Sequence, residues 1–330
     1  MSILPWQTEQ WQQLVSRRQQ AKLPHAILLS GAEGLGKHQF AKQFSESLLC
    51  HDNDENGAAC GQCRGCLLLK AGSHPDIKWI EPEEAGKAIK VDQIRSLAAF
   101  TPLSAQFEQG YKVILIGPAE SMNRAAANSL LKTLEEPADN TILILLSSAP
   151  QQLLATIRSR CQRLNFVAPD YATASHWLKT QSLQNAEQWL EIADGAPLTA
   201  LELANSDDSI ESRYENGLET LEALQSRRKD PLSTAAEWQK KDGLRAVKWL
   251  TNWVMDILRL AQGGQSSAIS CPSQQSRLTS FANQLDIDAL HAYLPHLYEA
   301  YRLLSTTQVN QQLLLEEILI RWAALPKNRL

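Results

Sequence analysis

The stretch GAEGLGKH, residues 31–38, decides the fold of this chain. It matches the phosphate-binding pattern GxxxxGK[ST] at every position except the last, where His38 replaces the serine or threonine. That hydroxyl holds Mg²⁺, and imidazole is a poor ligand for this hard, oxygen-seeking ion. We therefore expect a phosphate loop kept for structure, with at most weak nucleotide binding. Its candidate binding residues, predicted to be non-functional, are Gly31, Gly34, Gly36 and Lys37.

The sequence around this loop alternates between strand and helix patterns. A short apolar run at residues 26–30 predicts a buried strand, and residues 37–49 follow with helical periodicity. Two more apolar runs, at 113–116 and 142–146, enclose a strong helix-forming segment at 125–134. Strands that alternate with helices favour a parallel, doubly wound α/β domain.

The acidic groups of an ATP-hydrolysing site are missing from their expected place. Such a site needs an Asp for Mg²⁺ and usually a Glu for water, both directly after a buried strand. Here Gly117 and Pro118 follow the strand at 113–116, and Glu120 comes too late to share the metal. Together with His38, this second loss predicts a chain that does not hydrolyse ATP.

Four cysteines after the first helix have the spacing of a metal site: Cys50, Cys60, Cys63 and Cys66. Four thiolates form the tetrahedral, closed ligand set of a structural zinc ion. His51 is a second candidate ligand, but its position next to Cys50 makes ligation awkward. We therefore predict one structural zinc ion in an insert at about 50–66.

Composition restricts the function further. The 330 residues carry a net charge of −4, whereas a protein that grips DNA alone usually has a basic excess. No apolar run approaches the ~20 residues that span a bilayer, no signal peptide is visible, and the expected compartment is the cytoplasm. We predict three domains: the α/β domain at 1–166, a small helical lid domain at 167–206 and an all-α domain at 207–330.

Further motifs resemble one known family. The segment NSLLKTLEEP at 128–137, followed by SRC at 159–161, resembles the signature of AAA+ clamp-loader subunits of bacterial DNA polymerase III. Pro5-Trp6, VDQIR at 91–95 and the four-cysteine insert are also similar to that family, and NQQLLLE at 310–316 is a weaker match near the end of the chain. The resemblance implies an AAA+ sheet domain, a lid and a C-terminal oligomerisation collar.

The resemblance also implies a mechanism. Clamp loaders are five-membered rings with ATP sites at subunit interfaces, and Arg160 of the SRC motif matches an arginine finger donated in trans to a neighbour's nucleotide. The implied partners are the tau/gamma and delta subunits, which place ATP outside this chain, together with the sliding clamp and primed DNA. Leu198 stands where the family has a nucleotide-sensing Arg. The implied type is thus a subunit of the polymerase holoenzyme without ATPase activity of its own.

Two alternatives stay open at this point. One is an active clamp-loader ATPase that keeps Lys37 and holds Mg²⁺ in an unusual way. The other is a zinc-dependent DNA-binding module, which the acidic balance and the scattered basic residues around the cysteines disfavour.

Overall fold

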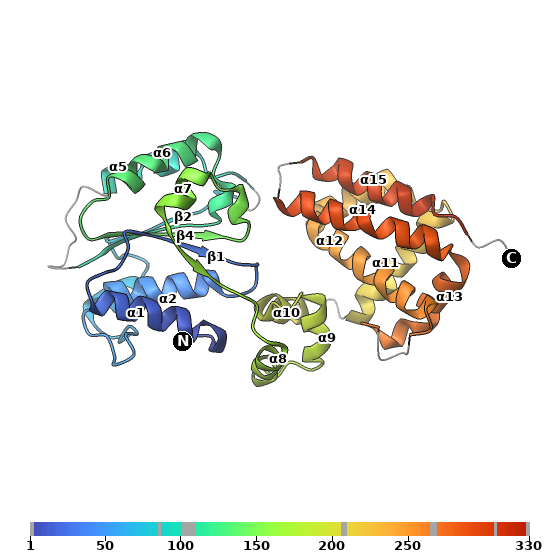
Figure 1. The fold of residues 1–330 in the computed structure, drawn as a ribbon, viewed down its shortest axis with the longest axis horizontal. Helices are drawn as coiled ribbons and strands as arrows, with labels where there is room; N and C mark the ends of the chain where they lie inside the picture. Colours follow the sequence, from blue (N-terminus) through green and yellow to red (C-terminus); the bar gives the residue numbers. More distant parts are fainter. Residues whose placement is uncertain are drawn as a thin grey trace. The chain divides into compact units, whose positions relative to one another are not determined.

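A computed structural model describes residues 3–84, 87–100, 110–205, 210–264, 269–306 and 309–327. The chain divides into two compact units (Figure 1). Unit 1 comprises Met1–Trp177 with Ala196–Thr199, and unit 2 comprises Leu178–Gly195 with Ala200–Leu330. The predicted boundary between lid and collar at 206/207 lies outside the described residues, and the three-domain division stays a prediction.

Unit 1 is built on a five-stranded parallel sheet with strand order β2-β3-β4-β1-β5. The central strand β4 lies between β3 and β1. Every residue of β1 and of β4 is buried. The strands are β1 (Ala26–Ser30), β2 (Ile77–Ile80), β3 (Lys112–Ile116), β4 (Thr141–Ser147) and β5 (Gln162–Asn165).

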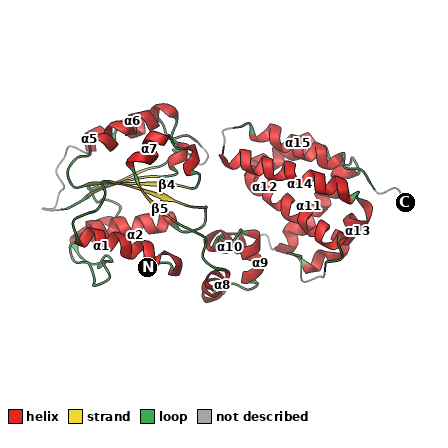
Figure 2. Ribbon diagram, viewed as in Figure 1, coloured by secondary structure: helices red, strands yellow, loops and turns green. Residues whose placement is uncertain are grey.

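Helices cover both faces of this sheet, as Figures 1 and 2 show. The α1–α2 side and the α4–α7 side receive alternate residues of each strand: Ile27 packs into the first cluster and Leu28 into the second. This explains why β1, β3 and β4 are continuous apolar runs, since both faces are buried. The helices are α1 (Thr8–Gln19), α2 (Lys37–Leu49), α3 (Arg64–Lys70), α4 (Val91–Arg95), α5 (Leu97–Phe100), α6 (Arg124–Glu135) and α7 (Ala155–Arg160).

From Tyr171 onward the described residues form helices and no named strand. In unit 2 the long α12 packs against α13, α14 and α15, and the indole of the fully buried Trp322 donates to the Leu221 carbonyl over 3.1 Å. The helices are α8 (Tyr171–Thr180), α9 (Ala186–Ile192), α10 (Pro197–Ala204), α11 (Ile210–Gln225), α12 (Pro231–Ala261), α13 (Gln275–Gln284), α14 (Ile287–Thr306) and α15 (Gln311–Ala323).

The predicted fold class, a parallel α/β sheet domain with a four-cysteine insert followed by helices, is confirmed. The sequence reading missed the edge strands β2 and β5, which are shorter and less apolar than the central ones. Among the described helices, none has the length and hydropathy to cross a membrane.

Candidate functional site

The phosphate-loop motif lies where the sequence predicts it, between β1 and α2. Gly36 adopts a left-handed conformation (φ 83°) directly before the first residue of α2, and Gly34 does the same with φ 74°. Residues other than glycine rarely adopt this backbone conformation, which explains the glycines in the loop. The backbone framework of a phosphate site is therefore preserved.

Lys37, however, is directed into its own loop. Its ammonium group donates to the carbonyls of Gly31 over 2.7 Å and Ala32 over 2.6 Å, and the side chain is buried. Burial lowers the pKa of Lys37 to about 8, against the opposing effect of nearby Glu120 and Glu33. The cation that would reach a terminal phosphate is thus held by two backbone carbonyls.

The start of α10 packs against the phosphate loop at Gly34. The Leu198 N–H donates to the Gly34 carbonyl over 3.0 Å, and a side chain at Gly34 would clash with Thr199. On the other side, Trp6 and Gln7 both donate to the Leu35 carbonyl. These contacts lie within unit 1, and they leave the loop packed by its own chain.

At the position of the missing Mg²⁺-binding hydroxyl, His38 contacts an aromatic ring and a carboxylate. The His38 ring stacks on Trp79, with centroids 4.6 Å apart, and its Nε2 lies 3.4 Å from a Glu81 carboxylate oxygen. A cavity of about 820 Å³ adjoins the loop, lined in part by Gly117 and Pro118 where an acidic pair is needed. That this chain does not hydrolyse ATP stays a prediction.

Glu120, the nearest carboxylate along the chain, serves the fold. One of its oxygens accepts the N–H groups of Ser148, over 2.8 Å, and Ala149, over 3.1 Å. These amides belong to the loop after β4, so that Glu120 fixes the end of that strand. That Glu120 comes too late in the chain to share a metal stays a prediction, and its contact with this loop was not predicted.

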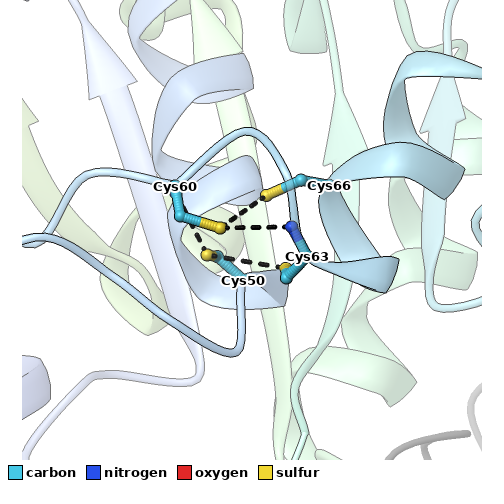
Figure 3. Close-up of side chains that lie close together, drawn as sticks. All are labelled: Cys50, Cys60, Cys63 and Cys66. Carbon is cyan, nitrogen blue, oxygen red and sulfur yellow. Dashed lines mark hydrogen bonds between the residues drawn. The ribbon is translucent and has the colours of Figure 1, made fainter.

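The four predicted cysteines converge at the end of α2 (Figure 3). Their sulfur atoms all lie within 4.8 Å of one another; those of Cys50 and Cys63 are 3.9 Å apart, and those of Cys60 and Cys66 are 4.0 Å apart. Four sulfurs about 2.3 Å from a tetrahedral ion are about 3.8 Å apart. The donor set and its spacing therefore fit one metal ion.

Backbone amides orient these sulfurs. The N–H of Cys60 points at Cys50 Sγ over 3.2 Å, and the N–H of Cys63 points at Cys60 Sγ over 3.3 Å. Burial would raise the pKa of Cys63, but hydrogen bonds from the N–H groups of Cys66 and His51 and from the Cys66 and Cys60 side chains lower the pKa to about 6. Among the described residues the ligand group contains the cysteines only, without His51.

The insert is fastened to the sheet domain by contacts with α1 and α2. Trp11 of α1 donates to the Asn56 carbonyl over 2.9 Å, and Ser47 of α2 donates to the Gly57 carbonyl over 2.6 Å. Gly65 brings α3 so close to the Leu49 carbonyl that any side chain there would clash. The cysteine cluster is therefore a supported part of unit 1.

Arg160, the predicted arginine finger, ends α7 and is exposed. Its Nη2 lies 2.7 Å from Glu135 Oε1 at the end of α6, and its Nη1 donates to the Thr156 carbonyl over 3.1 Å. The neighbouring Arg158 is also exposed, whereas Arg163 donates to the Ser30 hydroxyl over 3.0 Å. Sequence reading missed Glu135 as a partner, although it lies inside the LEEP segment that it singled out.

Comparisons with known proteins decide the family. The family described as "DNA polymerase III, delta subunit" matches residues 6–170, and its C-terminal counterpart matches residues 208–324. The DNA polymerase III subunit delta′ of Pseudomonas aeruginosa is 36% identical, with 98% of each chain covered. The chain belongs to the delta′ subunit family of DNA polymerase III.

Other relatives agree. The subunit delta′ of Escherichia coli is 31% identical over 97% of this chain and 95% of its own, and that of Bacillus subtilis is 36% identical over 58% and 57%. A solved DNA polymerase III gamma subunit-related protein from Thermotoga maritima is 19% identical, with 96% and 98% covered and a TM-score of 0.46, a likeness too weak to add to the assignment. The predicted family, the delta′ subunit of DNA polymerase III, is thereby confirmed.

Proposed function

We propose that this chain is a delta′ subunit that supports loading of the sliding clamp onto primed DNA without hydrolysing ATP itself. The observation that carries this proposal is the state of the phosphate loop. Lys37 is bonded to the Gly31 and Ala32 carbonyls, and the Leu198 amide caps Gly34. A loop filled in this way, without Mg²⁺ ligands, favours ATP chemistry in partner subunits.

The second part of the proposal gives Arg160 the role of a finger in trans. Its guanidinium is exposed at the end of a helix, and its planar fork of donors suits a phosphoryl group. In a five-membered ring it would stabilise charge on the nucleotide of a neighbouring tau/gamma subunit, with delta as a further partner. Such fingers are worth ~10³–10⁵ in rate at one site.

The cysteine cluster is proposed to hold one zinc ion with a structural role. All four ligands come from this chain, and four sulfurs complete a tetrahedral set without an open position. Such a site supplies no catalysis. It fixes the insert beside α2.

The compartment that we propose for this clamp-loader assembly is the cytoplasm.

The test compares Arg160→Ala, Arg158→Ala and Lys37→Ala in a reconstituted complex with tau/gamma and delta, with DNA-stimulated ATPase as the readout. R160A should lower turnover only in part, because other interfaces keep their own fingers. R160K should restore little, since a point charge cannot replace the guanidinium fork. R158A and K37A should leave turnover nearly unchanged.

Two results would contradict the proposal. Wild-type turnover by an intact R160A complex would show that Arg160 is not an arginine finger. Hydrolysis by the purified chain that disappears in K37A shows that the phosphate loop is active after all. Melting temperature and complex formation, measured on the same variants, separate loss of function from loss of fold.

A further inference from the structure

The guanidinium of Arg160 is engaged by its own chain on both terminal nitrogens. Nη2 lies 2.7 Å from Glu135 Oε1, and Nη1 donates to the Thr156 carbonyl over 3.1 Å. The two charged side chains keep 36% and 50% of their surface exposed. Two of the five N–H donors are thus used within the chain, and an incoming phosphoryl group competes with these partners for the guanidinium.

The backbone around this pair is rigidly supported, while the pair itself is at the surface. Leu130 and Leu134 of α6 pack in the same buried cluster as Ile157 of α7. Both helices end at the pair, α6 with Glu135 and α7 with Arg160, so that their negative dipole ends lie close to the cation. The position of the two Cα atoms is thus set by the core, and only the side chains have to move for release.

The strength of such a pair suits a reversible contact. An exposed ion pair contributes only about 0.2–1 kcal/mol and is weakened by salt, so that it does little for the stability of the fold. A phosphate offers more charge and accepts two parallel N–H bonds from an arginine. An incoming phosphoryl group would therefore outcompete the single carboxylate.

We propose that Glu135 is a latch that holds Arg160 within its own chain until the phosphoryl group of a neighbour's nucleotide replaces it. This inference rests on the proposed role of Arg160. Glu135 acts only through Arg160 and touches no nucleotide. Glu135 thereby reduces contact of Arg160 with the neighbour's nucleotide before the ring has closed around that nucleotide.

The test is Glu135→Gln in the reconstituted complex, since this change removes the charge and keeps the size. Without DNA and at subsaturating ATP, turnover at the one site that Arg160 serves should rise about 1.5- to 5-fold, the factor that corresponds to an exposed pair. Total turnover should rise by less, because the other interfaces keep their own fingers. The gain should shrink as salt is raised, because the pair in the wild type is then screened. Glu136→Gln, which changes the adjacent carboxylate, is the matched control and should have no effect.

The double variant R160A/E135Q shows whether the effect passes through the arginine. It should have the turnover of R160A alone, and the melting temperature of E135Q should equal that of the wild type. Unchanged or lowered turnover in E135Q overturns the latch, as does a gain that persists without Arg160. If R160A lowers turnover but E135Q does not raise it, the latch role of Glu135 is wrong and the finger role of Arg160 stands. If R160A has wild-type turnover, both roles are wrong.

Discussion

The cysteine insert at 50–66 and the phosphate loop at 31–38 lie at opposite ends of the same helix, α2, and had opposite fates. The insert keeps every donor of its ligand set, with sulfurs at tetrahedral spacing. The phosphate loop keeps its glycines and lysine but has lost the oxygen ligands. The comparison teaches that a preserved backbone framework does not preserve chemistry, which depends on the donor atoms.

The two regions also differ in what fills them. The sulfurs of the insert point at a shared centre that a metal ion fits. The centre of the phosphate loop is occupied by its own Lys37, while Leu198 and Thr199 cover Gly34. Gly34, a glycine of the phosphate-binding pattern, makes room here for the start of α10.

The largest expected effect is on the insert. Cys63→Ser should abolish binding of one zinc ion per chain, because the remaining three thiolates no longer close the tetrahedral site. The measurement is metal content by elemental analysis, together with titration of native thiols. Loss of the ion should loosen the insert locally, since its contacts to α1 and α2 persist.

The matched control is Cys271→Ser, which changes a buried thiol of unit 2 outside the cluster. It should keep the full metal content. If the wild type, purified with zinc supplied, carries none and its four cysteines titrate freely, the ligand assignment is wrong.

The central fold was accessible from the sequence because local pattern and tertiary burial agree there. The run at 26–30 is apolar throughout and is buried on both faces, and β1 begins and ends where predicted. Strand β5 was not predicted, because its sequence QRLN has no apolar periodicity: it has an amide side chain at each end and a charged arginine between them. Pairing with β1 makes it a strand.

The sites divide along the same line. Cysteine spacing is local and sufficient, so all four ligands were predicted and the structure brings them together. The contact of Thr199 with Gly34 joins residues 165 positions apart, and the Glu135–Arg160 pair joins two helices. Neither leaves a sequence pattern, because both depend on how β1, α6 and α7 are placed by the sheet.

The second prediction sharpens the contrast at Lys37. A folded-state pKa near 8, below the ordinary 10.5, means that the unfolded chain binds the proton more tightly between these values. The free energy of unfolding of the wild type should therefore rise with pH in this window relative to Lys37→Met, by on the order of 3 kcal/mol in full.

Urea unfolding of both chains at a series of pH values measures this difference, and other titrating groups cancel because they are common to both. A difference that is constant from pH 7 to pH 10.5 would mean that Lys37 is not held in a desolvated site. A difference that falls with rising pH would mean that its ammonium group is stabilised, as a working phosphate ligand would be.

The smallest expected effect concerns the closure by α10. Gly34→Ala should destabilise the chain, because φ is 74° there and the new methyl group would clash with Thr199. Gly72→Ala is the matched control: its φ is 67°, but nothing lies near its missing side chain. The left-handed backbone is common to both, so that the difference between the two variants, about 1–3 kcal/mol, isolates the overpacking at Thr199. Equal losses in the two variants would mean that Thr199 yields freely, and the phosphate loop would then be open to a ligand.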